Sequence, residues 1–259
     1  MVQLIMEDVE DMGFLRQHIH TLDREFDFWM TNHTIEIDYN GQKHKLARYN
    51  DMSQGPRPES YKEDIDVAKH FDKHEDREEL YAELKAAAES GWDFSSRGLE
   101  RHHGVERRAD DGLSYQIGQQ SEGGVLWHED VGVWLDYSTE SHRRRDYFYP
   151  SNLAPLWTGS YDKARKEYYV SRVINYLDKV KGGIPTTMEH SGEQWDYPNA
   201  WPPLQYMVVT GLADSGQPQA MRYASEVATK WVRSNFEVWK DKTAMLEKLI
   251  SRLFVLIII

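Results

Sequence analysis

A ten-residue stretch near the end of the chain constrains its own backbone more strongly than any other part of the sequence. It reads Gln194-Trp195-Asp196-Tyr197-Pro198-Asn199-Ala200-Trp201-Pro202-Pro203. Each proline fixes its own φ angle and favours an extended residue before it, so this backbone is stiff. The two tryptophans place flat apolar faces beside carboxylate and amide groups, a mixture that suits a sugar ring. From the residues alone, a sugar platform and a buried aromatic corner between two helices are equally good interpretations.

Composition excludes several classes of partner and site. The 43 acidic residues outnumber the 31 basic ones, and the net charge of −12 disfavours nucleic acid and anionic membranes as partners. The chain has no cysteine, so it has neither disulfides nor a cysteine metal site. Its longest apolar run, Leu253 to Ile259, is far shorter than the roughly 20 residues of a membrane span. His102 and His103 have no nearby carboxylate pair at ligand spacing, so we expect no metal site.

Apolar side chains recur at three- and four-residue steps in several segments, which is typical of helices. We expect helices from about Val2 to Met30, His74 to Ser90, Ser160 to about Lys181, Leu204 to Leu212 and Pro218 to Lys240. Trp201-Pro202-Pro203 starts the fourth of these, because proline is tolerated in a helix's first turn. The apolar stripe of the first helix consists of Phe14, Ile19, Leu22, Phe26 and Trp29. The residues expected to face inward are Val170, Val173, Ile174, Leu177 and Val180 in the third helix, and Met221, Ala224, Ala228, Trp231 and Val232 in the last. Two short extended runs flank Asn40-Gly41, a pair that suits a turn with two positive φ angles. The sequence therefore predicts a mainly helical protein with a β-hairpin near residues 35–49.

A loop with two prolines, Gly55 to Tyr61, carries an arginine and a glutamate two residues apart. On an extended backbone, residues i and i+2 face the same side. Arg57 and Glu59 are then placed to bind one polyhydroxylated ligand together. From the residues alone, we favour the alternative that the two side chains form a surface ion pair.

A second candidate follows the helix expected from His74 to Ser90. Gly91 stands where a helix-capping glycine belongs, and Asp93 follows between Trp92 and Phe94. Burial against aromatic rings and the negative end of a helix dipole both raise the pKa of a carboxyl group. A raised pKa suits a general acid near neutral pH. The alternative is a solvated aspartate in a surface loop.

Together these stretches resemble the trehalases, glycoside hydrolase family 37. Gln-Trp-Asp-x-Pro-x-Ala-Trp-x-Pro is similar to the family's second signature, and Arg57-Pro58-Glu59-Ser60-Tyr61 resembles its substrate-binding loop. Ser90-Gly91-Trp92-Asp93-Phe94-Ser95-Ser96-Arg97 resembles its catalytic-acid motif. The resemblance covers roughly residues 1–97 and 127–247. Residues 98–124 are polar and lack a helical period, so we expect an out-of-family, irregular segment there.

The resemblance implies an all-α fold, an incomplete (α/α)₆ toroid that forms a single partial domain over residues 1–259. It implies hydrolysis of α,α-trehalose to glucose by an inverting acid/base mechanism, without a cofactor, and a secreted or plasma-membrane-associated protein. Asp93 is the implied catalytic acid. The implied substrate-binding residues are Arg57, Pro58, Glu59, Gly91, Trp195 and Asp196. We expect Arg57, Glu59, Asp93 and Trp195 to converge on one face of the helical body.

The second catalytic carboxylate of the family, the general base, has no matching residue in this sequence. In the family, a Gly-Gly-Gly-Gly-Glu-Tyr loop carries the base, and these 259 residues contain no such sequence. Inversion requires two carboxyl groups about 6.5–9.5 Å apart. We therefore expect weak or absent hydrolysis, and the alternative is a non-catalytic sugar-binding or interaction fragment. Possible substitutes for the base are Glu129, Glu189 and Glu193, of which Glu193 is favoured because it precedes Gln194.

Overall fold

The computed structural model describes residues 6, 8–9, 11–49, 51, 53–92, 95, 115–116, 124–139, 141–178 and 183–251. Helices dominate this part of the chain, which confirms the predicted all-α class. The helices are α2 (Met12–Asn32), α3 (Tyr61–Ala68), α4 (His74–Ser90), α5 (Ala154–Thr158), α6 (Lys166–Leu177), α7 (Pro202–Asp214) and α8 (Pro218–Lys242). No helix in the described ranges is both long and apolar enough to cross a membrane.

The strands are short and pair only in antiparallel fashion within the described ranges. They are β1 (Thr34–Tyr39), β2 (Gln42–Ala47), β3 (Tyr115–Gln116), β4 (Trp127–His128), β5 (Val133–Trp134), β6 (Tyr137–Ser138), β7 (Arg143–Arg144), β8 (Asn199–Ala200) and β9 (Leu249–Ile250). β3 lies inside the segment expected to be irregular and pairs with the end of β2. The backbone of residues 115–116 is therefore extended, and most of the rest of 98–124 lies outside the described residues.

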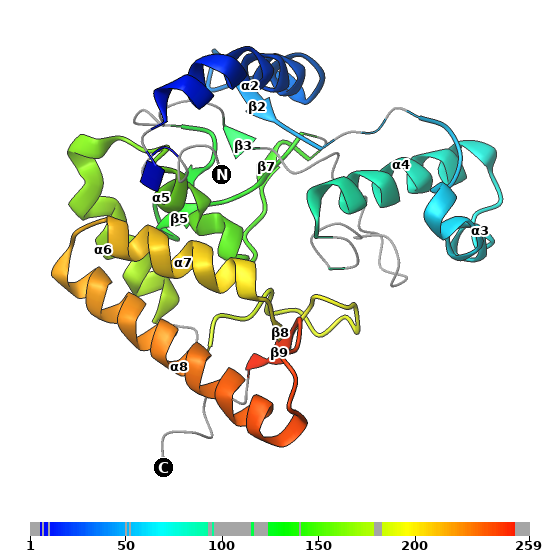
Figure 1. Ribbon diagram of the computed structural model, residues 1–259. Coiled ribbons are helices and arrows are strands. Elements are labelled where there is room, and N and C mark those ends of the chain that lie inside the picture. Colours follow the sequence, from blue (N-terminus) through cyan, green and yellow to red (C-terminus); the bar gives the residue numbers. More distant parts are fainter. Residues whose placement is uncertain are drawn as a thin grey trace.

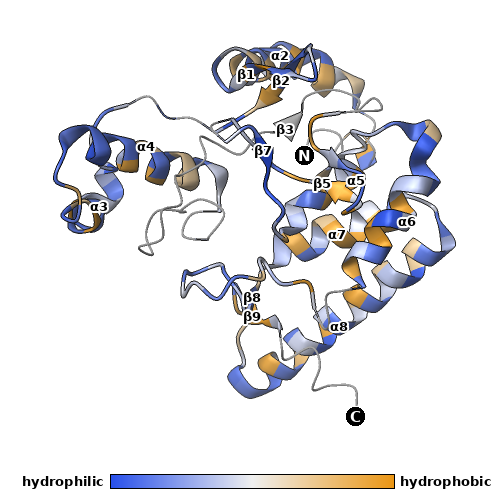
Figure 2. Cartoon of the chain, turned by 180° about the vertical axis from the view of Figure 1, so that it is seen from behind, coloured by the Kyte–Doolittle hydropathy of each residue, from blue (hydrophilic) through white to orange (hydrophobic). Residues whose placement is uncertain are grey.

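The helices form one main body and one smaller lobe (Figure 1). The main body contains α5, α6, α7 and α8, with α7 packed against both α5 and α8. The pair α3 and α4 forms the lobe beside this body, and α2 lies with the hairpin over another side. Figure 2 shows hydrophobic residues concentrated on β5 and α7 near the centre of the main body.

The core of the main body follows the predicted apolar spacing of α6. Its residues Val170, Val173, Ile174 and Leu177 are all buried, as expected from their three- and four-residue steps. They pack in one cluster with residues from α7, α8 and the β4–β5 region. Val180, the fifth residue of the predicted stripe, lies outside the described residues.

Local signals placed several element boundaries correctly. α4 runs from His74 to Ser90 as predicted, and Gly91 caps it with a φ of +72°. α7 begins with prolines in its first turn, where their missing N–H groups cost nothing. Asn40 and Gly41 both have positive φ and join β1 to β2 in the register Tyr39↔Gln42. The hairpin prediction is therefore confirmed.

The predicted inward face of α8 is partly wrong. Its buried residues are Ala220, Ala224, Val227 and Ser234, whereas Met221 and Val232 are 51% and 64% exposed. Periodicity shows which residues share a helix face, but a partner element decides which face is covered. The outer face of α8 lines an open apolar groove of about 410 Å³. The groove residues are Trp231, Val232, Asn235, Phe236, Trp239 and Met245.

α2 is amphipathic, but none of its described residues is buried. Of its predicted apolar stripe, Phe26 and Trp29 are exposed, while Phe14 and Leu22 are only half-buried. Within the described residues, no element packs over the whole apolar stripe of α2. α2 and the outer face of α8 are thus two exposed apolar surfaces on one helical body.

Candidate functional site

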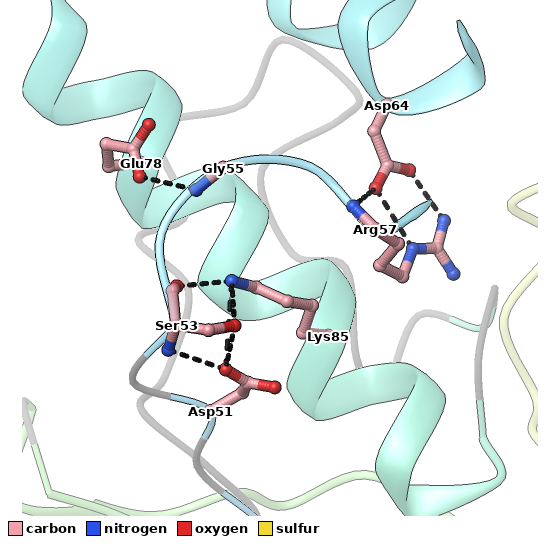
Figure 3. Close-up of polar contacts among 7 residues, drawn as sticks. All are labelled: Asp51, Ser53, Gly55, Arg57, Asp64, Glu78 and Lys85. Atoms are coloured by element: carbon pink, nitrogen blue, oxygen red, sulfur yellow. Dashed lines mark hydrogen bonds and ion pairs between the residues drawn. The ribbon is translucent and has the colours of Figure 1, made fainter. Parts of the chain in front are cut away.

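The loop of residues 51–61, called here the arginine loop, lies against α3 and α4 (Figure 3). Arg57 is extended, but Pro58–Ser60 form a 3₁₀ turn that leads into α3. This turn breaks the extended geometry on which the predicted shared orientation of Arg57 and Glu59 depended. Arg57 is 5% exposed, whereas Glu59 lies at the surface. The two side chains therefore occupy different environments, and their joint contact with one ligand stays a prediction.

Arg57 forms a buried ion pair with Asp64 of α3. Its Nε donates to Oδ2 at 3.0 Å and its Nη2 donates to Oδ1 at 2.6 Å. The backbone N–H of Arg57 also donates to Asp64 Oδ2, at 2.9 Å. The alternative of a surface pair with Glu59 is thus replaced by a buried pair with a residue seven positions further on.

α4 holds the other part of the arginine loop through two charged side chains (Figure 3). Glu78 Oε2 accepts a hydrogen bond from the Gly55 N–H at 2.8 Å. The buried Lys85 donates from Nζ to the carbonyl and, at 2.8 Å, to the hydroxyl of Ser53. Lys85 Nζ also lies 3.7 Å from Asp51 Oδ1. The hydrogen bond from the Ser53 hydroxyl, with a smaller contribution from Lys85, lowers the pKa of Asp51.

The carboxyl-terminal end of α4 carries the predicted acid motif. The Gly91 N–H donates to the Ala88 carbonyl at 3.2 Å and closes the helix. Trp92 is buried and packs edge-on against Tyr149, and its carbonyl accepts from the buried Ser95 hydroxyl at 2.9 Å. Asp93 itself lies outside the described residues. Its role as catalytic acid and its raised pKa stay predictions, as does the sugar contact of Gly91.

The stretch around Trp195 forms an aromatic corner. Trp195 is only 4% exposed. Its ring centre lies 4.7 Å from that of Trp201, and the two ring planes are inclined at 33°. Lys248 Nζ lies 5.5 Å from the centre of the Trp195 ring. This geometry matches the second of the two interpretations, the buried corner. A sugar contact by Trp195 stays a prediction.

Asp196 ties together the segment that we call the tryptophan loop, residues 187–201. Asp196 is 0% exposed, and its Oδ1 accepts from the Thr187 hydroxyl at 2.8 Å. Its Oδ2 accepts from the Ser191 hydroxyl. Both carboxylate oxygens therefore bond within the loop, so Asp196 orders the backbone there. Its predicted contact with a sugar stays a prediction.

Residues 248–251 bind the tryptophan loop through hydrogen bonds. No sequence pattern predicted this contact. β9 pairs with β8, and the Ser251 N–H donates to the Pro198 carbonyl at 2.6 Å. Lys248 Nζ donates to the Gln194 carbonyl at 2.9 Å. The signal for this pairing was weak, because each strand is only two residues long.

Glu129 is already occupied by structural contacts. Its Oε2 accepts from Trp127 Nε1 at 2.6 Å, and its Oε1 accepts from the Tyr168 hydroxyl. With both oxygens engaged, Glu129 is poorly suited to activate water. Among the described residues there is no group of three or more His, Asp or Glu side chains placed to hold a metal ion. His102 and His103 lie outside those residues.

Comparison with known proteins identifies the family to which the chain belongs. The Trehalase family model matches residues 1–117 and 118–250. The chain belongs to the trehalase family. The two matched ranges meet inside the 98–124 segment, and whether that segment is a separate, out-of-family insertion stays a prediction.

Named relatives and one solved structure agree with this membership. The chain is 44% identical to a trehalase of Apis mellifera over 96% of its length and 37% identical to a trehalase of Homo sapiens, also over 96%. These alignments cover 46% and 49% of the relatives, so the chain spans about half of their length. A neutral trehalase from Saccharomyces cerevisiae matches with a TM-score of 0.58 and 18% identity, over 81% of this chain and 49% of that one. This structural match confirms the predicted fold, part of an (α/α)₆ toroid.

Proposed function

We propose that this chain binds α,α-trehalose with the arginine loop, the carboxyl-terminal end of α4 and the tryptophan loop. The observation that carries the proposal is the buried Arg57, fixed by Asp64 in the very motif that resembles the family's substrate-binding loop. Family membership supports the choice of sugar, since the relatives are named trehalases. A buried arginine with a fixed orientation suits recognition of ligand oxygens in a site shielded from water.

The reaction that we propose for this site is inverting hydrolysis. The carboxyl group of Asp93 protonates the glycosidic oxygen while a second carboxylate activates the attacking water. Arg57, Pro58, Glu59 and Gly91 line the sugar site. Trp195 supplies an apolar wall of the sugar site. Asp196 contacts the sugar and also holds the tryptophan loop in place.

Turnover by these 259 residues alone is slow or absent in this proposal. They contain no Gly-Gly-Gly-Gly-Glu-Tyr sequence, and the two oxygens of Glu129 are engaged elsewhere. Glu193 remains the favoured substitute, because it lies in the tryptophan loop beside Gln194. A general base contributes about 10²–10⁴-fold to rate, but only when it is placed to about an ångström.

A non-catalytic role in sugar binding or protein interaction is the second candidate. The exposed apolar surfaces of α2 and of the outer face of α8 favour it, because such surfaces often mark contacts with another segment or partner. The two candidates differ in whether glucose is formed.

Glucose release from trehalose by the purified chain tests the proposal. We expect a rate at least about 10²-fold below that of a full-length relative, since base assistance is missing. Asp93→Asn should then change the residual rate little. The matched control is Asp66→Asn, an exposed aspartate of α3 that pairs with Lys69. Rapid turnover that is abolished by Asp93→Asn and retained by Asp66→Asn would show that a complete catalytic pair exists.

A further inference from the structure

Asp64 is a buried carboxylate outside the predicted sugar-binding residues, and all of its described hydrogen bonds go to Arg57. Three separate N–H groups of Arg57 donate to it, two from the guanidinium and one from the backbone. Asp64 is 1% exposed. The same carboxylate therefore fixes both the backbone and the charged head of this arginine.

This arrangement orders Arg57 before any ligand arrives. A two-pronged pair between a guanidinium and a carboxylate fixes the plane of the guanidinium as well as its position. An arginine left to rotate would lose conformational freedom on binding, which weakens affinity. Any ligand contact of the guanidinium has to use N–H groups other than the two that face Asp64. The pair with Asp64 therefore fixes which edge of the Arg57 guanidinium faces away from Asp64.

Lys85 fixes the arginine loop to the helix that carries the predicted acid. Its Nζ bonds to the carbonyl and hydroxyl of Ser53 and lies near the Asp51 carboxylate. Lys85 is buried, although lysine is seldom buried without polar partners. On α4, Lys85 precedes Gly91 by six residues, or about 9 Å of helix at 1.5 Å per residue. A rigid helix thus sets the spacing between Ser53 and the segment that leads to Asp93.

We propose that Asp64 and Lys85 are positioning residues for trehalose binding. Asp64 orients the guanidinium of Arg57, and Lys85 keeps the arginine loop at a fixed distance from the end of α4. Neither side chain needs to touch the sugar. This inference rests on the proposed function, because it assumes that Arg57 contacts trehalose.

A double-mutant cycle with trehalose as the titrant tests the role of Asp64. Asp64→Asn keeps the size of the side chain but turns an N–H group or a neutral oxygen toward the guanidinium. We expect it to weaken the Kd for trehalose by about 10- to 100-fold, as loss of supporting partners does at metal sites. In the Arg57→Ala background the same change should have no further effect on Kd, because Asp64 acts through Arg57. The control Asp66→Asn should leave Kd unchanged.

Isothermal titration separates positioning from simple loss of fold, because it reports affinity and the binding-competent fraction independently. A purely structural role would lower the competent fraction and leave the Kd of the remaining protein unchanged, and that result would overturn the proposal for Asp64. An equal loss of affinity with and without Arg57 would overturn it as well. Lys85→Met keeps the apolar stem and removes the charged head, and we expect about a tenfold weaker Kd. The control Lys69→Met alters an exposed lysine, and equal Kd values for the two lysine variants would exclude a positioning role for Lys85.

The wild-type titration separates this inference from the function on which it rests. Absence of trehalose binding by the wild-type chain would overturn both. Binding that is unaffected by Arg57→Ala would leave trehalose recognition standing and would overturn the positioning role of Asp64. Binding that depends on Arg57 but not on Asp64 would overturn that role alone.

Discussion

Replacing Asp64 by alanine is expected to lower the free energy of unfolding by about 3–5 kcal/mol, the usual cost of removing one partner from a buried ion pair. The Arg57 guanidinium would keep its burial but lose the carboxylate that balances its charge and accepts two of its hydrogen bonds. The backbone N–H of Arg57 would lose its acceptor at the same time. Urea unfolding followed by tryptophan fluorescence and circular dichroism measures the change.

Two further variants identify the cause of that loss. Asp66→Ala removes an aspartate from the same helix, but one whose pair with Lys69 is exposed, so little change is expected. Replacing Arg57 and Asp64 together by leucine removes both buried charges and should destabilise less than Asp64→Ala alone. If Asp64→Ala and Asp66→Ala unfold at the same urea concentration, the buried pair does not stabilise the loop as described.

Replacing Gly211 by valine is expected to lower the free energy of unfolding by up to about 3 kcal/mol, the upper part of the range for overpacking. Gly211 lies in α7 where this helix crosses α5. A Cβ atom at position 211 would lie 2.9 Å from the backbone nitrogen of Trp157 and 3.1 Å from the Cα of Trp157. These are main-chain atoms, so a side-chain rotation cannot relieve the clash, and α7 would have to move away from α5.

Thermal unfolding of Gly211→Val and of a control checks this packing. Ser225→Ala alters an exposed position of α8 and should remain within about 0.5 kcal/mol of the wild type, as most surface substitutions do. A Gly211→Val variant with the melting temperature of the wild type would contradict the close approach of α7 and α5.

The elements predicted correctly from the sequence depend on local backbone preferences. Gly91 ends α4 because glycine adopts a positive φ without strain. Asn40-Gly41 closes the hairpin because asparagine and glycine both suit the two positive φ angles of this turn. Pro202 marks the start of α7 because proline fits a helix's first turn. Met221 and Val232 were assigned to the wrong face of α8, because only tertiary packing decides which side of an apolar helix is covered.

The sequence motifs name candidate site residues, whose roles stay predictions, but they do not indicate which side chains contact them. The sequence motif singled out Arg57, whereas its pairing with Asp64 depends on the 3₁₀ turn that begins at Pro58. The first turn of α3 carries two acidic residues, Glu63 and Asp64, and the sequence alone does not single out Asp64 as the partner. Asp196 likewise pairs with Thr187 and Ser191, hydroxyl residues whose position follows from the path of the loop.

In the proposed function, three segments far apart in the sequence form one trehalose site. Hydrogen–deuterium exchange with and without saturating trehalose tests it directly, because bound sugar slows amide exchange in the segments that it orders. We predict slower exchange in residues 53–61, in residues 88–95 and in the tryptophan loop, with no change in α8. Protection confined to one of the three segments, or absent from all of them, would contradict a shared site.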